Sequence, residues 1–371
     1  MIGLPYTCKF LWAPVFDEVP PLLGGRRRGW LIPVQVLLLV CIVGLAMSDP
    51  VHHVGWVFAV GVALAFVSAS QDILIDAWRI ETFEQREQGI ALAGYVWGYR
   101  LAMQCAGPGL IGLSVLLGWH RAVLVMLPLA LVGPAAALLA AEPAVERLTE
   151  RAGFAARFTV AVWTPLKDLA SRHGAPIIIA FILVFRLGEA LATGVLSKYY
   201  FSLGYNRLDI SQAFGPLSLV AALAGAAAGG WMVVRFGTGR TLLLSGVFQT
   251  AVLLLYPALT FLPHMQAMLV LVSMVESFAN NFSEAGFLTY LSGLCNHENT
   301  ATQYALLSSM PALALRTIGG LSGFLAADLG YLHYFYASTI AALPAMALML
   351  VILRYYPPKE GKEERAFLHQ R

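Results

Sequence analysis

Residues 14–29 read PVFDEVPPLLGGRRRG, and residues 229–240 read GGWMVVRFGTGR. Each stretch follows an apolar segment and ends in arginine with glycine nearby, and six apolar segments separate the two. A motif repeated at such an interval indicates two similar halves, which is a common plan among proteins with many membrane-spanning helices. The sequence therefore predicts an all-α integral membrane protein built from two six-helix halves.

The composition indicates that a lipid bilayer surrounds most of the chain. Of the 371 residues, 58% are hydrophobic and 12% are charged, whereas soluble proteins carry about a quarter charged residues. The net charge of +3 is small, and the basic residues lie in short loops, so we expect no nucleic acid partner. The sequence shows no metal-ligand cluster, no nucleophile with a base at useful spacing and no P-loop. We therefore expect neither an enzyme nor a cofactor nor a metal site.

Ten apolar runs are long enough to cross the hydrocarbon core as helices, which requires about 18 residues or more. The opening stretch MIGLPYTCKFLWAPVF is also apolar, but it is short and Lys9 interrupts it. The ten runs lie near 30–48, 54–78, 88–117, 121–141, 176–200, 210–234, 241–259, 265–293, 301–327 and 331–353.

The domain organisation follows from matching the two halves. The charged segment 142–175 has six apolar runs after it but only four complete runs before it, plus the opening stretch. The match predicts that the opening stretch is the remainder of helix 2, that helix 1 is absent ahead of it, and that about 11 spans are present; a true eleven-span protein is the alternative. The predicted parts are an N-terminal half at 1–141, a cytoplasmic linker at 142–175, a C-terminal half at 176–354 and a cytoplasmic tail at 355–371.

Lysine and arginine predict the orientation, because short loops rich in them stay in the cytoplasm. Seventeen of the 24 lysines and arginines fall in alternate loops and in the C-terminal tail. The sequence therefore predicts a multi-pass protein with a cytoplasmic C-terminus. At the ends of spans, the doublets Tyr199–Tyr200 and Tyr355–Tyr356 are expected to anchor helices at the membrane interface.

The two arginine-rich loops resemble the signature loop of the major facilitator superfamily, in which an Asp precedes a cluster of glycine and basic residues. In the second copy the match is weaker, because Val234 stands where an acid is expected. The resemblance implies the twelve-helix fold of that superfamily. It also implies a gating or structural role for Asp17, Arg26, Arg27 and Arg28.

Several longer stretches are similar to the AmpG family of muropeptide permeases, whose relatives include acetyl-CoA transporters. The resemblance covers nearly the whole chain, and its motifs occur in the same order. They are KFLWAPVFDEVPP at 9–21, GGRRRGW at 24–30, SASQDILIDAWRIE at 68–81, GYRLAM at 98–103, LCNHENTATQYALLSS at 294–309 and LALRTIGG at 313–320.

This resemblance implies a secondary active transporter of the bacterial inner membrane. Its partners would be an anionic glycopeptide such as an anhydromuropeptide, protons and the lipid bilayer, and import would serve cell-wall recycling. We expect a monomer. Two alternatives stay open, namely a carrier of acetyl-CoA or another anionic metabolite, and a relic or sensor that does not transport.

Ionisable residues inside spans are the candidate functional residues, because placing one there costs about 2.5–3.5 kcal/mol on insertion scales. Asp72 and Asp76 lie four residues apart and share a helix face with Arg79. Asp72 is a candidate for proton coupling and Gln71 for substrate binding. Asp76 and Arg79 are assigned a gating or structural role, with a simple clamp at a helix end as the alternative.

Two arginines are candidates for binding an anionic substrate, because guanidinium holds carboxylate or phosphate through two hydrogen bonds. Arg100 lies about 18 Å into its predicted helix, and Arg316 has a similar position in its own span. Each is expected to be buried, and the alternative is that an acid of the same half neutralises it. The neighbouring Tyr99 could stack on a sugar ring, with a role as a core residue or interface anchor as the alternative.

Two acids near mid-membrane are candidates for proton coupling, because burial and a nearby arginine shift a carboxyl pKa in opposite directions. These are Glu189 and Glu276. A simple ion pair with Arg186, one turn away, is the alternative for Glu189. Asn280 continues a polar stripe from Glu276 and is a candidate substrate ligand.

Overall fold

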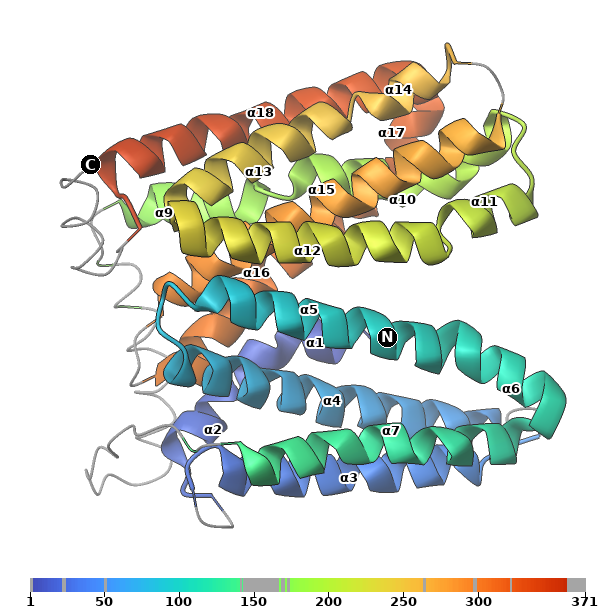
Figure 1. Ribbon diagram of the computed structural model, residues 1–371, viewed down its shortest axis with the longest axis vertical. Coiled ribbons are helices and arrows are strands. Elements are labelled where there is room, and N and C mark those ends of the chain that lie inside the picture. Colours follow the sequence, from blue (N-terminus) through green and yellow to red (C-terminus); the bar gives the residue numbers. More distant parts are fainter. Residues whose placement is uncertain are drawn as a thin grey trace. The chain divides into compact units, whose positions relative to one another are not determined.

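A computed structural model describes residues 3–21, 25–49, 52–140, 142, 167, 171, 174–262, 265–295, 299–320 and 322–358 (Figure 1). Within these ranges the regular structure is helical. The helices are α1 Leu4–Cys8, η1 Lys9–Leu11, α2 Ala13–Glu18, α3 Arg28–Ala46, α4 Val54–Thr82, α5 Gln88–Gln104, η2 Cys105–Gly109, α6 Leu110–Leu117, α7 Trp119–Leu139, α9 Ala175–Val184, α10 Leu187–Ser202, α11 Arg207–Ala213, α12 Pro216–Phe236, α13 Thr238–Val252, α14 Leu255–Leu259, α15 Gln266–Gly293, α16 Thr300–Gly319, α17 Ser322–Leu329 and α18 Tyr331–Tyr355.

All ten predicted spans coincide with helices. Eight helical segments of the described chain are long and apolar enough to cross a membrane, and α16 with α17 forms a ninth that is bent by 41°. The tenth, α15, is 28 residues long, but its polar residues lower its mean hydropathy. The opening stretch is helical only in the short pieces α1, η1 and α2.

Large apolar side chains on these helices are exposed, as lipid-facing residues must be. Val115, Leu116 and Leu139 are 82%, 79% and 88% exposed. Exposed apolar patches of this kind would promote aggregation in water, whereas hydrocarbon accommodates them at no cost. The chain is therefore a multi-pass membrane protein.

The described chain divides into two compact units. Unit 1 comprises residues 1–82, 98–168 and 295–309, and unit 2 comprises residues 83–97, 169–294 and 310–371. Segments 83–97 and 295–309 thus group differently from the halves expected at 1–141 and 176–354. The boundaries of those halves stay a prediction.

Unit 1 is organised around α3 and α4. Helix α3 packs against both α4 and α7, and the short helices α1 and α2 pack against α4 (Figure 1). Trp12 joins the opening stretch to α4. Its indole nitrogen donates to the Ser70 hydroxyl at 3.0 Å, and its ring centroid lies 4.6 Å from that of Phe66. The core of this unit also holds Ala301 and Ala305, from the first turns of α16.

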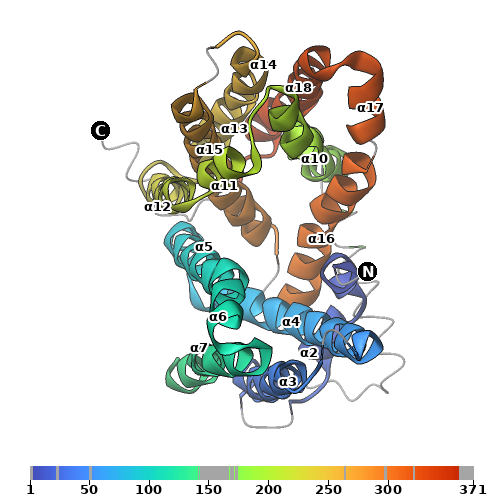
Figure 2. The same cartoon turned by 90° about the vertical axis from the view of Figure 1, so that its right-hand side faces the viewer.

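Unit 2 contains a cluster of buried aromatic residues. Helices α10, α17 and α18 lie together in Figure 2, and the Tyr334 hydroxyl of α18 donates to the Leu191 carbonyl of α10 at 2.7 Å. Tyr199 and Tyr200 are each 1% exposed. The expectation that this doublet anchors the helix at the membrane interface was wrong, because both rings pack inside the unit.

Helices α12 and α15 of unit 2 approach closely because glycines face the contact. A Cβ atom built at Gly225 would collide with the Phe278 carbonyl, and one at Gly229 would lie 2.7 Å from the Ala285 Cβ. A side chain at either position would push the helices apart.

We therefore expect Gly225→Val to lower the thermal unfolding midpoint of the purified protein, since overpacking costs about 1–3 kcal/mol. Gly94→Val is the matched control, because a Cβ at Gly94 meets nothing within 4 Å. Equal midpoints for the two variants would contradict the close contact.

Candidate functional site

Three clusters of polar and charged side chains lie inside the helical units. The first two belong to unit 1 and the third to unit 2. They are the Arg27 cluster (Asp17, Arg26, Arg27, Glu81), the Lys9 cluster (Lys9, Asp72, Asp76, Arg79) and the Arg186 cluster (Arg186, Glu189, Asn280, Glu284).

Arg27 lies immediately before α3 and is completely buried. Its Nη2 donates to Asp17 Oδ1 at 2.8 Å, and its Nε donates to Glu81 Oε2 at 2.9 Å. A second bond joins Nη2 to the other oxygen of Glu81, and Nη1 donates to the Phe16 carbonyl at 3.1 Å. The guanidinium therefore connects the end of α2, the start of α3 and the end of α4.

The two neighbouring arginines differ in their electrostatic surroundings. Burial by itself would lower the pKa of Arg27, but the Asp17 and Glu81 carboxylates outweigh it and raise that pKa above the ordinary value. Burial and then the charge of Arg27 lower the pKa of Arg26, whose Nη2 lies 3.5 Å from Asp17. Arg27 is thus the principal counter-ion of the two carboxylates.

Asp17 binds a further element through its other oxygen. Its Oδ2 accepts from the Thr302 backbone nitrogen at 2.8 Å and from the Thr302 hydroxyl at 2.7 Å. Thr302 lies in the first turn of α16, where backbone N–H groups lack helical partners and a negative charge is favourable. Asp17 therefore acts as a capping group for α16 and links it to Arg27.

Glu142 holds the start of α3 in the same region. Its carboxylate accepts from the backbone nitrogens of Arg27 at 2.6 Å and Arg28 at 3.2 Å. Gly25 has φ of 89°, and a Cβ there would lie 2.9 Å from the Glu142 carboxyl group. The glycine of this loop is thus required both by its backbone conformation and by the space that Glu142 occupies.

The Lys9 cluster joins the opening stretch to α4. Lys9 Nζ lies 2.6 Å from Asp72 Oδ2 and 3.8 Å from Asp76 Oδ2, and Arg79 Nη2 lies 3.2 Å from Asp76 Oδ1. The Arg79 guanidinium also sits over the Tyr304 ring, 5.3 Å from its centroid. The predicted carboxylate pair is therefore held by a cation on each side.

We expect Lys9→Met to destabilise the protein by about 3 kcal/mol, because it removes one partner of a largely buried ion pair. Chemical unfolding of the detergent-purified protein measures the loss. Adding Asp72→Asn to Lys9→Met should restore part of it, and purely additive effects of the two changes would argue against direct coupling.

The Arg186 cluster lies where a predicted span is broken. Helix α9 ends at Val184 and α10 begins at Leu187, so Arg186 sits in the break. Its Nε and Nη2 donate to the two oxygens of Glu189 at 2.9 and 2.8 Å. From α15, Asn280 Oδ1 and Glu284 Oε1 accept from the same guanidinium at 3.1 and 3.2 Å. Broken helices in membranes are tolerated where they are buried in protein or line a cavity.

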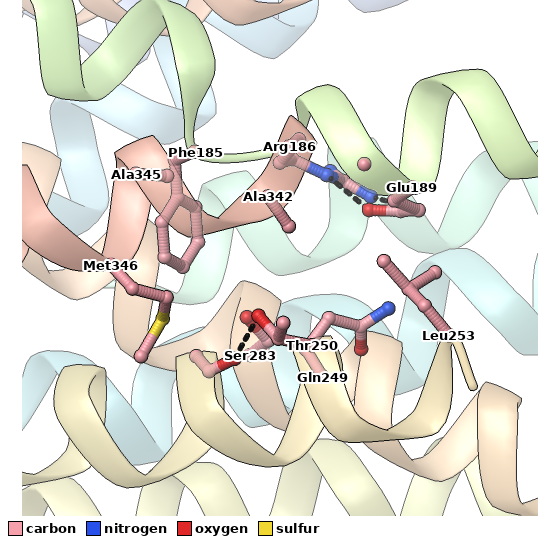
Figure 3. A pocket seen from close by; sticks show the side chains of 12 residues that line it. Phe185, Arg186, Glu189, Gln249, Thr250, Leu253, Ser283, Ala342, Ala345 and Met346 are labelled. Carbon is pink, nitrogen blue, oxygen red and sulfur yellow. Dashed lines mark hydrogen bonds and ion pairs between the residues drawn. The ribbon is translucent and has the colours of Figure 1, made fainter. Parts of the chain in front are cut away.

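A small pocket of unit 2 adjoins this break and has room for a water molecule (Figure 3). Arg186 and Glu189 line one side, and Gln249 of α13 lines another. Both amide atoms of Gln249 are buried and have no hydrogen-bond partner among the described residues.

The remaining candidate residues lie apart from these clusters. Glu276 is buried at 8% exposure and lies close to Tyr256. Gln71 and Arg100 are half-buried, whereas Tyr99 and Arg316 are exposed. The expectation that Arg316 is buried was therefore wrong.

Sequence reasoning missed several partners in these clusters. Lys9 was noted only as an interruption of an apolar stretch, although a lysine there signals a buried counter-ion. Glu81 and Glu142 were not singled out, and Gln249 carried no signal beyond being polar inside an apolar helix.

Ion pairs enclosed within apolar helices, together with broken helices that adjoin a polar pocket, define a polytopic membrane transporter rather than an enzyme. The profile described as "Major Facilitator Superfamily" matches residues 6–314. The chain belongs to that superfamily and, within it, to the AmpG-like permeases.

Two relatives illustrate this membership. The chain is 33% identical over 354 residues to "Anhydromuropeptide permease" of Escherichia coli (strain K12). This match covers 95% of this chain and 71% of the relative. It is 29% identical over 354 residues to "Putative transporter AmpG 4" of Rickettsia felis, covering 94% of this chain and 86% of the relative.

Solved structures share the fold. The human organic anion transporter MFSD10 superposes with a TM-score of 0.71 at 16% identity, covering 94% of this chain and 82% of that one. FucP in its outward conformation gives 0.69 at 11% identity, covering 97% and 89%. At these identities the likeness concerns the fold alone.

Proposed function

We propose that this transporter imports an anionic glycopeptide, such as an anhydromuropeptide, across the bacterial inner membrane in symport with protons. The observation that carries the proposal is the 33% identity, over 354 residues, to a relative named anhydromuropeptide permease. The distribution of lysine and arginine supports a cytoplasmic C-terminus, and the inward direction of transport is what the resemblance to the AmpG family implies.

The substrate would be recognised by charge and by stacking. Arg316 is exposed on α16, and its side chain makes no ion pair or hydrogen bond with the other described residues, so its guanidinium is available for a carboxylate of the substrate. Arg100, Tyr99 and Gln71 are proposed as further ligands in unit 1. Asn280 is proposed in unit 2, where it also contacts Arg186.

Protons would bind to carboxylates whose cationic partners can change. Asp72 has Lys9 as its partner, and Glu189 has Arg186. Glu276 instead lies against a tyrosine. A carboxylate in such surroundings can exchange a proton when the transporter changes conformation. The Arg27 cluster, which includes the cap on α16, is proposed as the gating contact.

Uptake of labelled anhydromuropeptide into proteoliposomes tests the proposal. We expect uptake that a protonophore abolishes, and we expect Arg100→Gln or Arg316→Gln to reduce it at least about tenfold, equivalent to about 1.4 kcal/mol of binding energy. Arg207→Gln is the control, because Arg207 is an exposed arginine at the start of α11, outside the candidate sites.

Three results would overturn parts of this proposal. Uptake that persists without a proton gradient would remove proton coupling. Competition by acetyl-CoA but not by muropeptide would indicate a carrier of other anionic metabolites. Unchanged uptake in both arginine variants would remove Arg100 and Arg316 from the binding site.

A further inference from the structure

The pocket beside the Arg186–Glu189 pair has the properties of a hydrated site. Four helices of unit 2 enclose it, namely α10, α13, α15 and α18. The Gln249 amide points toward the side of the pocket on which Arg186 and Glu189 lie (Figure 3). Both of its polar atoms are buried without a partner in the described chain. An amide in that state is strongly disfavoured unless a water molecule satisfies it.

We propose that this pocket holds a water molecule between the Gln249 amide and the Arg186–Glu189 pair, and that this water delivers protons to Glu189. The second part rests on the proposed proton symport, whereas the first part stands independently of it.

The chemistry of the lining favours water over a metal cation. A buried water molecule needs two to four polar partners, and the lining supplies the Gln249 amide, the Glu189 carboxylate and the Thr250 hydroxyl. Thr250 Oγ1 donates to the Gly246 carbonyl at 2.9 Å, so its oxygen can still accept. The Arg186 guanidinium repels a cation from the same space.

The hydrogen bonds of Arg186 would permit Glu189 to take up a proton. Both Glu189 oxygens accept from Arg186, so protonation of one oxygen breaks one of these bonds. The freed N–H can turn to Asn280 or Glu284 of α15, which already accept from the same guanidinium. Protonation would thus move the arginine from α10 toward α15.

The proton balance of this step is simple. The water passes one proton to a Glu189 oxygen and accepts another from the aqueous side, so it is regenerated and the net change is one added proton. Among the described residues, the titratable groups around Glu189 include Arg186, which it contacts, Glu284 of α15, which binds the same arginine, and Tyr256 of α14.

X-ray radiolytic footprinting in nanodiscs tests the water site, because hydroxyl radicals formed from bound water oxidise adjacent side chains. Met346 lines the pocket, whereas the buried Met349 on the same helix does not. We expect Gln249→Leu to reduce labelling of Met346 several-fold while labelling of Met349 is unchanged. Gln212→Leu, at an exposed glutamine of α11, should have no effect.

The unfolding temperature of Gln249→Leu is a second measurement, because labelling of Met346 could fall for reasons other than loss of the water molecule. An apolar residue raises stability when it replaces a buried amide that has no hydrogen-bond partner. It does not raise stability when it replaces an amide that is hydrogen-bonded to a water molecule. Unchanged Met346 labelling in Gln249→Leu, or a higher unfolding temperature than wild type, would overturn the water site. Gln249→Glu keeps polar atoms and should retain the labelling if Gln249→Leu fails to fold.

The role in proton delivery has a separate readout. In proteoliposomes, Gln249→Leu should shift the pH profile of uptake, and an unchanged profile would overturn proton delivery while leaving the water site intact. Absence of uptake in the wild-type protein would refute the proposed transport function, and with it proton delivery, but not the labelling result.

Discussion

Replacing Arg186 with methionine is expected to abolish proton-driven uptake, because three groups on two helices depend on one guanidinium. The change leaves Glu189 and Glu284, which lie 2.8 and 3.2 Å from Arg186, without their cation. Breaking a buried ion pair by removing one partner costs about 3–5 kcal/mol, so a carboxyl group will take a proton or the break in the span will rearrange. Uptake into proteoliposomes and the unfolding temperature of the purified protein measure the two effects.

Lys198→Met is the matched control, because Lys198 is an exposed cation on α10. Arg186→Lys keeps the charge but cannot reproduce the paired hydrogen bonds to Glu189, so we expect intermediate uptake. Adding Glu189→Gln to Arg186→Met should recover stability but not transport. Wild-type uptake in Arg186→Met would show that this ion pair is dispensable.

Replacing Arg27 with methionine is expected to cause the largest loss of stability. The side chain is completely buried between Asp17 and Glu81, so its removal leaves two carboxylates of unit 1 without their principal counter-ion, and only the more distant Arg26 remains. The cost of about 3–5 kcal/mol corresponds to a fall in unfolding temperature on the order of 10 °C for a unit of this size. Thermal unfolding of the detergent-purified protein measures it.

The control for Arg27 is Arg240→Met, at an exposed arginine in the repeated loop motif. Adding Glu81→Gln to Arg27→Met should recover part of the loss, because one unpaired charge is then removed. An unfolding temperature for Arg27→Met within 2 °C or so of wild type would contradict the buried bridge.

The spans could be predicted from the sequence because hydrocarbon thickness demands long apolar runs. Local pairs could be predicted as well, since Asp76 and Arg79, like Arg186 and Glu189, lie three residues apart on one helix. For Glu189 the sequence left two readings open, and the ion pair is present in the structure. Its part in proton coupling stays a prediction.

The long-range contacts could not be predicted in the same way. Lys9 meets Asp72 across 63 residues, and Arg27 meets Glu81 across 54. Hydropathy gives the position of each helix along the chain but not its neighbours, so the partner of a buried charge stays unknown until the packing is known.

The direction in which a side chain faces was a second source of error. Depth along a helix predicted a buried Arg316, yet the residue is exposed. Tyr199 and Tyr200 stand at the end of a span, where aromatic rings serve equally well as interface anchors or as core. Their burial at 1% exposure follows from contacts with α14 and α18, such as the bond from the Tyr199 hydroxyl to the Tyr256 carbonyl.

The two oxygens of Asp17 serve different elements, one facing Arg27 and the other Thr302. Asparagine has the same shape, but one of its two terminal atoms is an NH2 group that would face a donor on either side. Glutamate is longer by one methylene and would displace one contact in order to keep the other. Both oxygens and this short side-chain length are needed together, so position 17 has no conservative substitute among the natural amino acids.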